Sequence, residues 1–480
     1  MQKPPLLYWL ICASYELLGT NLVAARIWSV LCGVGLALIA ARLHRELWRR
    51  DGTLAGLIVL SSVGVAIESR RAMLDLPMGC FVALAVLLGV RWRANGRTTT
   101  LVFAATALAA AALTKGPVAI LFAGTAALAG MFARREARRP VRGAQLAIAA
   151  LVFLALASPW PIAMWLQWPQ LGDVIAEQSE ARQFTWFRIE AIGPVIGGGL
   201  ALIAPWSIAV VAAVVAGARR LAGDERREHR RLVLWVLLSA APFLFFAAFE
   251  RYLIPMVVPM ATLAARLFDD ASARARRTHL TIATALLAVP VLAGSAFTLW
   301  FGLAVVAPVA ALVVLAWTLR AAWRSASPRR VALGCAATLT LLLGGVYPAI
   351  GINRLPDDLP ADLASRDVAT FQISQPGMLS MRTRKSVLAL PEGCDLRTKL
   401  AGFDGYVFVL EDRAARFAAA CESAGFRPEA VGSFRSLFSR KAWLRFVREG
   451  TTRDDWRAAF TERSLAALTP EFTVYRLRGG

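Results

Sequence analysis

The sequence is short of the residues that metal centres and soluble surfaces need. Only 3 of its 480 residues are histidine, and Asp, Glu, Lys and Arg together make up 18%. The histidines and the six cysteines show none of the spacings that bind metal. An ordinary soluble domain carries about 25% charged residues. The low charge and the 57% of apolar residues therefore indicate a membrane protein.

The N-terminus also lacks the pattern of an export signal. Lys3 precedes Pro4, Pro5 and a leucine-rich stretch, but Glu16 and Arg26 soon follow and no small-residue cleavage site appears. Proline fixes its own φ and restricts the residue before it, which holds Lys3 extended in front of an apolar helix. From this stretch alone, Lys3 is interpreted as an interfacial lysine whose amine reaches water.

Long apolar stretches fill the first 350 residues. About twelve of them are long enough, or nearly so, to cross a bilayer with about 20 residues each. They lie near 24–42, 54–67, 73–91, 99–114, 117–133, 144–165, 191–217, 232–249, 252–268, 279–300, 302–320 and 330–350. The sequence therefore predicts an α-helical polytopic membrane domain over residues 1–350.

Acidic residues are scarce beside basic ones, with 32 against 54 and a net charge of +22. In a soluble protein this excess would suggest nucleic acid, but the arginines gather in alternate loops between the apolar stretches, so no nucleic-acid partner is expected. These loops lie near 42–50, 91–97, 134–142, 219–231, 274–277 and 324–330. By the positive-inside rule they face the cytoplasm, which places the other loops and the tail outside.

Residues 351–480 are less apolar and predict a small soluble α/β domain on the periplasmic side. Strands are expected at 406–410, 429–438 and 472–477, a helix with a glycine cap at 411–425, and a linker at 354–360. Cys394 and Cys421 both lie in this tail. A disulfide between them and two free thiols are both compatible with an exported domain.

Charged residues at the outer ends of the spans form a candidate site, because ionisable groups are costly there unless they are paired or in water. If the segment after residue 67 is helical, Glu68, Arg71 and Asp75 share one face, with Arg71 and Asp75 as an i, i+4 pair. Asp75 is equally compatible with the N-cap of the next span. A carboxylate beside arginines also suits a site that holds a hydroxyl next to an anionic leaving group.

Two further cations lie at outer turns. Lys115 precedes Gly116 and Pro117 between two spans, where free helix amides and a lysine suit a phosphate. The plain alternative is a tight turn with an interfacial lysine. Arg251 either clamps a phosphate with its planar fork or pairs with its neighbour Glu250.

One long outer loop is rich in tryptophan and carries more charges. Its tryptophans, typical of an aromatic belt at the membrane surface, are Trp160, Trp165, Trp168 and Trp186. Residues 171–184 predict an amphipathic helix lying on the membrane. This helix would direct Glu177, Glu180 and Arg182 toward a cavity or water.

The motifs carrying these residues occur in a characteristic order. They are "KPPLLYWLICASYELLGTNLVAARIWSVLCG", "RRAMLDLPMGCFVALAVLLG", "AALTKGPVAILF", "SPWPIAMW", "APWS" and "ERYLIPMVVPMATLAARL". In combination they resemble the bacterial 4-amino-4-deoxy-L-arabinose transferase and protein O-mannosyltransferase superfamily, whose members are GT-C fold membrane glycosyltransferases. The resemblance covers roughly residues 1–350, and the tail is similar to the soluble outer domain that many members carry.

The resemblance implies a transfer reaction on the outer face of the bacterial inner membrane. A sugar would move from an undecaprenyl-phosphate-like polyprenyl phosphate to a lipid (lipid A-like), protein or glycan acceptor. Lys3 matches the lysine of the family's "KPP" motif near the lipid phosphate, and Asp75 matches an acidic residue of the second outer motif, with a catalytic role. Lys115 matches the "TKGP" turn, and Arg251 with Tyr252 matches "RY". Arg71, Glu177 and Arg182 are further candidates for binding the substrate.

The sequence departs from the family pattern at its start. Members have an additional first span and an outer loop whose Asp is thought to be the catalytic base, and both would precede Met1. Gln2 also stands where some members have a Glu linked to metal binding. The resemblance thus predicts an N-terminally truncated form of a longer enzyme and leaves the use of a divalent metal open, with no other cofactor expected.

Two other classes of protein fit parts of the pattern. A secondary transporter or lipid flippase also has about twelve spans, but such proteins usually show two similar halves, and the sequence shows no internal repeat. A non-catalytic relative that binds polyprenyl phosphate is the third interpretation. The sequence identifies neither the sugar nor the acceptor, because such specificity depends on a few contacts.

Overall fold

The computed structural model describes residues 3–132, 142–168, 170, 172, 187–246, 249–357, 359–373, 377–439 and 446–477, without the side chains of 132, 218–220, 377 and 378. Its internal contacts divide the chain into two compact units, which are described separately. The first unit comprises residues 1–19, 23–293 and 310–343. The second comprises residues 20–22, 294–309 and 344–480.

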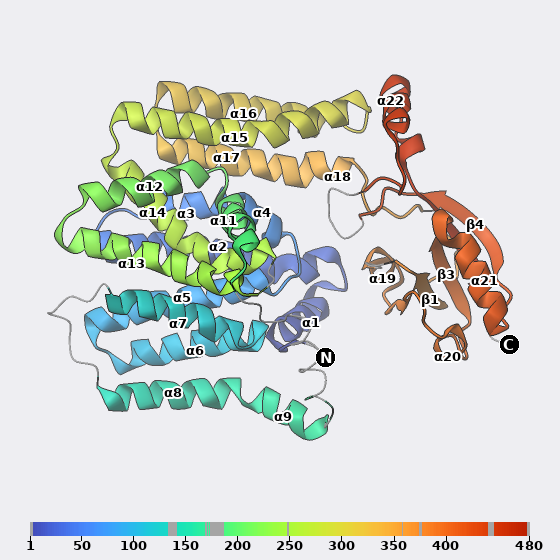
Figure 1. The fold of residues 1–480 in the computed structure, drawn as a ribbon, viewed down its shortest axis with the longest axis horizontal. Helices are drawn as coiled ribbons and strands as arrows, with labels where there is room; N and C mark the ends of the chain where they lie inside the picture. The colour runs from blue at the N-terminus through green and yellow to red at the C-terminus, as the bar shows by residue number, and fades with distance from the viewer. Residues whose placement is uncertain are drawn as a thin grey trace. The chain divides into compact units, whose positions relative to one another are not determined.

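The first unit is built from helices, most of which follow a common direction (Figure 1). Its helices up to the "RY" motif are α1 (Leu6–Leu18), α2 (Leu22–Trp48), α3 (Thr53–Leu60), α4 (Val63–Ser69), α5 (Asp75–Asn95), α6 (Thr98–Lys115), α7 (Val118–Phe132), α8 (Gly143–Ala157), α9 (Pro159–Gln167), α11 (Ile189–Ile203), α12 (Ser207–Arg220), α13 (Gly223–Ala240) and the short η1 (Ala241–Leu244). The later helices are η2 (Glu250–Met256), α14 (Val257–Asp270), α15 (Ala273–Trp300), α16 (Val306–Arg324) and α17 (Pro328–Leu341), of which α15 and α16 extend into the second unit.

Seven of the described helical segments are long and apolar enough to cross a membrane, or nine if each of two bent pairs forms one span. The polytopic helical fold predicted from the sequence is therefore confirmed. The expectation of an uninterrupted span at 191–217 is wrong, because α11 and α12 meet at 107°. Pro205 lies at this break and has no N–H to continue the helix. The stretch 54–67 is likewise divided into the short helices α3 and α4.

The arginine-rich loops that the structure describes gather at one end of the first unit. Ion pairs that join segments at this end include Arg91–Glu46 at 2.8 Å, Arg50–Asp270 at 2.9 Å, Arg266–Glu225 at 2.9 Å and Arg329–Asp51. His44, buried in α2, contacts Asp269 at 3.1 Å at the same end. The alternation of loops along the sequence thus becomes two chemically different ends in space.

The second unit contains a five-stranded mixed sheet with the strand order β2-β1-β3-β5-β4. The strands are β1 (Asp367–Phe371), β2 (Leu388–Leu390), β3 (Gly405–Leu410), β4 (Glu429–Arg435) and β5 (Glu471–Leu477). The helical segments are η3 (Leu342–Val346), α18 (Tyr347–Ala349), α19 (Gly377–Thr383), α20 (Leu396–Lys399), η4 (Glu411–Arg413), α21 (Ala414–Ala424), α22 (Arg453–Glu462) and η5 (Ala466–Leu468). β3 pairs in parallel with β1 and antiparallel with β5.

The sequence located the centre of this sheet correctly. All six residues of β3 are buried, as expected for a continuous apolar run covered on both faces. Helix α21 ends at Gly425, whose φ of 83° is the left-handed conformation of a glycine cap. The predicted strands near 429 and 472 and the small α/β domain are confirmed, whereas β1 and β2 had not been predicted.

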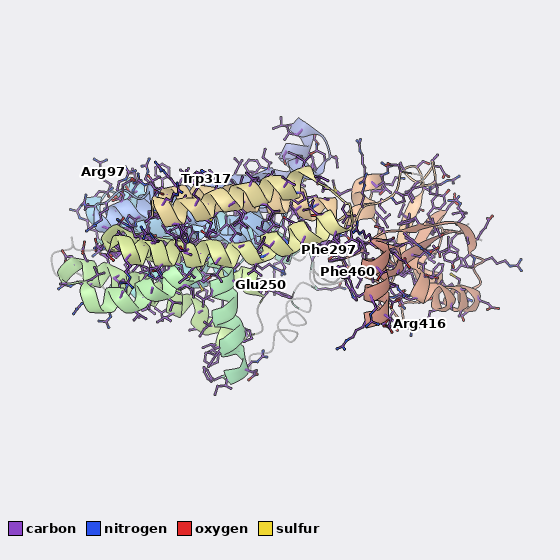
Figure 2. All side chains as sticks on the ribbon, turned by 90° about the horizontal axis from the view of Figure 1, so that it is seen from above. Arg97, Glu250, Phe297, Trp317, Arg416 and Phe460 are labelled. Carbon is purple, nitrogen blue, oxygen red and sulfur yellow. The ribbon has the colours of Figure 1, made fainter. Side chains whose placement is uncertain are left out.

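The end of α15 belongs to the second unit and packs on α22. Trp300 donates a hydrogen bond from its indole nitrogen to the carbonyl oxygen of Phe460 at 3.1 Å, and the Phe301 and Phe460 rings lie 5.3 Å apart. Figure 2 shows this junction, where Phe297 and Phe460 are labelled. The adjoining ends of α15 and α16 therefore belong to the sheet unit. The domain boundary predicted from the sequence, between residues 350 and 351, did not include them.

Cys394 and Cys421 are both free thiols in the structure. Burial of Cys421 in the core with Phe417 and Val407 raises the pKa of its thiol to about 11. Because the thiolate is the reactive form, we expect iodoacetamide to label Cys421 slowly in the folded protein at pH 8, with a rate that keeps rising to about pH 11. Peptide mass spectrometry after timed labelling of the full chain measures this rate.

The control for this prediction is the same labelling in denaturant. There Cys421 has its ordinary pKa of about 8.5, so the labelling rate is expected to be half-maximal near that pH and to level off about one to one and a half units higher. Rapid labelling of the folded chain at pH 8, or a plateau below pH 10, would contradict the prediction.

Candidate active site

Asp75 lies at the centre of a cluster of charges at the end of the first unit away from the arginine-rich loops. It is the first residue of α5, and it is buried with 2% of its surface exposed. One carboxylate oxygen accepts a hydrogen bond from the amine of Lys115. The other oxygen lies 3.5 Å from Nε of Arg251. A buried carboxylate is thereby held between two cations from distant parts of the chain.

Lys115 is the last residue of α6, and its side chain extends to Asp75. Its amine also lies 3.6 Å from the centre of the Tyr252 ring, which is a cation–π contact. The side chain is 13% exposed. Pairing with a carboxylate and contact with an aromatic face both lower the cost of keeping an ammonium group in this partly dry place.

Arg251 contacts Asp75 from η2. Its guanidinium lies 4.4 Å from the Phe249 ring and 5.7 Å from the Tyr252 ring. It therefore contacts Asp75 and not the neighbouring Glu250, which was the plain alternative in the sequence. Phe249 is a further residue of this cluster that was not predicted from the sequence. The signal that could have identified it is its position directly before the "ERY" motif.

Glu68 and Arg71 form a second ion pair beside Asp75. Nη1 of Arg71 donates to Glu68 at 2.9 Å. The predicted i, i+4 pair of Arg71 with Asp75 is wrong, because α4 ends at Ser69 and a turn separates it from α5. Asp75 is not the N-cap either, since that position is Leu74.

The sequence placed Glu68 on the same face as Arg71 and Asp75 but assigned it no catalytic or binding role. Its side chain is only 4% exposed, and its second carboxylate oxygen has no hydrogen-bond partner in the described structure. A buried unsatisfied carboxylate oxygen is costly and often marks a place where a ligand group or water binds. The sequence feature that could have identified Glu68 as a site residue is its position at the very end of an apolar stretch.

The "KPP" motif meets the "TKGP" turn in the structure. A Cβ placed on Gly116 would stand 3.8 Å from the ring of Pro4, and the charge of Lys3 is close enough to act on Lys115. The sequence had predicted free amides at this turn. Instead, the amides of Ala119 and Ile120 donate hydrogen bonds to carbonyl oxygens of the turn. The groups at this turn that could bind an anion are therefore the amines of Lys3 and Lys115.

Four predicted residues of the outer loop lie outside the described residues, namely Glu177, Glu180, Arg182 and Trp186, as does the predicted amphipathic helix 171–184 apart from residue 172. Within the described part of the chain, Trp165 and Trp168 are exposed by 61% and 52%, as a belt requires. No group of three or more His, Cys, Asp or Glu side chains that could hold a metal ion occurs among the described residues.

Gly79 lets α5 approach η2 and so sets the spacing between Asp75 and Arg251. A Cβ at Gly79 would stand 2.8 Å from Cγ2 of Ile254, which is fully buried. We expect Gly79→Val to destabilise the protein by about 1–3 kcal/mol through overpacking. The matched control is Gly124→Val on α7, where an added Cβ meets nothing within 4 Å.

Thermal unfolding in detergent measures this difference between the two valine variants. Arg251 would also move away from Asp75 in Gly79→Val, so any activity that depends on both should fall together with stability. Equal unfolding temperatures for the two variants would show that the close approach at Gly79 does not matter.

Helical membrane units combined with a small sheet unit are found in the GT-C glycosyltransferases, and the comparisons with known proteins agree with this class. The family model for dolichyl-phosphate-mannose-protein mannosyltransferase matches residues 2–165. The crystal structure of ArnT from Cupriavidus metallidurans in the apo state matches with a TM-score of 0.69 and 18% identity, covering 90% of this chain and 86% of that one. Over its first third the chain is therefore similar to a family of membrane mannosyltransferases, and its fold is similar to that of ArnT.

Among individual proteins, the chain is similar to the undecaprenyl phosphate-alpha-4-amino-4-deoxy-L-arabinose arabinosyl transferase of Pseudomonas aeruginosa strain UCBPP-PA14. The two are 29% identical over 281 residues, which cover 55% of this chain and 49% of that protein. The chain thus spans about half the length of this relative. A second crystal structure, of the Cupriavidus ArnT bound to undecaprenyl phosphate, matches with a TM-score of 0.68 and 18% identity over 90% of this chain and 86% of that one.

Proposed function

We propose that the chain is a glycosyltransferase that moves a sugar from a polyprenyl phosphate, of the undecaprenyl phosphate type, to a lipid, protein or glycan acceptor. The observation that carries this proposal is the position of Asp75 between Lys115 and Arg251 at one end of the helical unit. The ArnT that was crystallised with undecaprenyl phosphate has the same fold, which supports this class of donor. The sheet unit and this end of the helices would face the periplasm.

The charges suit the departure of a phosphate. In the proposed reaction an acceptor hydroxyl attacks the anomeric carbon, and the bond between that carbon and the phosphate oxygen breaks. The negative charge that develops on the phosphate is stabilised by Lys115 and Arg251, with Lys3 nearby. The proton of the hydroxyl passes to the Asp75 carboxylate.

Donor binding would also prepare the base. In the structure both cations are engaged by Asp75. A phosphate that arrives at Lys115 and Arg251 competes with the carboxylate for them, because both anions use the same donors. The carboxylate is then available to an acceptor, and Arg71 with Glu68 lies next to it to orient a sugar hydroxyl.

The test is transfer in proteoliposomes that contain the full chain, a polyprenyl phosphate carrying a radiolabelled sugar, and a lipid acceptor fraction. We expect the label to move to the acceptor and polyprenyl phosphate to be released in equal amount. Exchange of the labelled lipid between leaflets without release of polyprenyl phosphate would instead establish a flippase. Binding of polyprenyl phosphate with neither event would establish a non-catalytic binding protein.

A further inference from the structure

The adjoining ends of α15 and α16 pack on α22 within the second unit. Phe301, which follows α15 directly, is buried together with Ala459 of α22, and Phe297 and Trp456 pack against them. Helices α15 and α16 are both long and apolar enough to cross a membrane. The turn between them therefore lies where two spans leave the hydrocarbon region. Helix α22, which contacts this turn, is held at the membrane surface.

Exposed apolar side chains lie beside this contact. Trp300 and Phe460, whose ring centres are 6.5 Å apart, are exposed by 46% and 43%. Val305 in the turn and Val306 at the start of α16 are exposed by 63% and 83%. We call these four residues the interfacial patch. Tryptophan is typical of the boundary between membrane and water, because its ring is apolar and its N–H is polar.

The interfacial patch continues one face of α16. Val306, Val309 and Val313 are spaced three and four positions apart, which places them on the same side of the helix, and all three are exposed. In a bilayer such a face is surrounded by lipid chains. Because the patch begins where this face ends, the surface that covers the patch is the same bilayer and not a soluble partner.

Arg463 adds a cation to the interfacial patch. It ends α22 with a φ of 52°, the left-handed conformation that Gly425 adopts at the end of α21. This conformation favours glycine, so a non-glycine residue there is strained and often serves a function. The guanidinium lies 4.8 Å from the centre of the Trp300 ring. Among the described residues it has no ion-pair partner, so its planar fork is open to an anion.

We propose that the interfacial patch binds the surface of a phospholipid bilayer, with the guanidinium of Arg463 at a lipid phosphate. The rings of Trp300 and Phe460 occupy the head-group region, where an apolar face and a polar edge are both accommodated. Arginine binds phosphate oxygens with two parallel N–H donors. Helix α22 is then an interfacial helix that fixes the sheet unit to the membrane, independently of any transfer reaction.

Photocrosslinking of the full chain in phosphatidylcholine nanodiscs tests the contact of the patch with lipid. The photoreactive amino acid p-benzoylphenylalanine is placed at position 460 or, as a control, at position 416. Arg416 is 70% exposed on α21, and Figure 2 shows it well away from Phe297 and Phe460. We expect mass spectrometry to find lipid adducts at position 460 and none above background at position 416.

Hydrogen exchange of the α22 amides tests the role of Arg463. Nanodiscs of phosphatidylcholine are compared with nanodiscs of digalactosyldiacylglycerol, a lipid without phosphate, with identical acyl chains. We expect exchange to be about two- to fivefold slower in phosphatidylcholine, the size of an exposed ion pair. Arg463→Gly should abolish this difference without lowering the unfolding temperature, because glycine suits the left-handed conformation. Arg457→Gln, which removes a guanidinium paired with Asp454, should preserve it.

Each measurement has outcomes that would overturn the proposal. Absence of lipid adducts at position 460, or equal adducts at positions 460 and 416, would show that the patch does not contact lipid in particular. A crosslinked dimer at position 460 would assign the patch to a second copy of the chain. Equal exchange of wild-type α22 in the two lipids, or a difference that persists in Arg463→Gly, would show that Arg463 does not bind phosphate.

Discussion

Replacing Asp75 by asparagine is expected to lower the turnover number for sugar transfer by about 10²–10⁴-fold, the usual contribution of a general base. Asparagine keeps the size of the side chain but cannot accept the proton of the acceptor hydroxyl. The affinity for polyprenyl phosphate should remain equal or increase, because the carboxylate that competes for Lys115 and Arg251 has been removed. A purely structural ion pair predicts the opposite combination, with weaker binding and lower stability.

Turnover and donor affinity must therefore be measured separately for this variant, together with its unfolding temperature. The matched control is Asp270→Asn, which removes a carboxylate paired with two arginines at the other end of the unit. That change should leave transfer unaffected. An Asp75→Asn protein that retained more than half of the wild-type turnover would eliminate Asp75 as the base.

Replacing Lys115 by methionine is expected to weaken the binding of polyprenyl phosphate about 10- to 150-fold. This range corresponds to about 1.5–3 kcal/mol for a hydrogen bond to a charged group, at 1.4 kcal/mol for each factor of ten. Methionine retains the apolar stem against Tyr252 but loses the ammonium group. Turnover should fall as well, because the departing phosphate loses a cation that stabilises its charge.

Two companion variants separate charge from packing. Lys115→Arg keeps the positive charge and should retain most of the donor affinity, although its planar fork fits the position less well. Tyr252→Leu removes the cation–π contact and should cost about 0.5–2 kcal/mol of stability or affinity. Titration of the purified chain with undecaprenyl phosphate gives each value. Unchanged affinity in Lys115→Met would remove Lys115 from the phosphate site.

The comparison of Arg71 and Arg251 shows where local sequence patterns fail. Both were expected near a carboxylate, and both have one. Arg71, however, pairs with Glu68 and not with Asp75, because the chain leaves the helix between them. Arg251 pairs with Asp75 and not with its neighbour Glu250, because η2 packs on α5. Spacing rules such as i, i+4 hold only while the helix continues.

The sequence by itself determined the class of the protein, the chemical difference between its two ends and the centre of the sheet. These properties follow from the composition of the chain and the order of its segments. An apolar run favours the bilayer and an arginine-rich loop favours the cytoplasmic side, whichever other segments pack beside them. The tertiary structure alone decided that Asp75 meets Lys115, 40 residues away, that Glu68 is buried with a free oxygen, and that α11 and α12 bend apart. Such contacts depend on which helices pack together, and helix packing is set by the fit of many side chains at once.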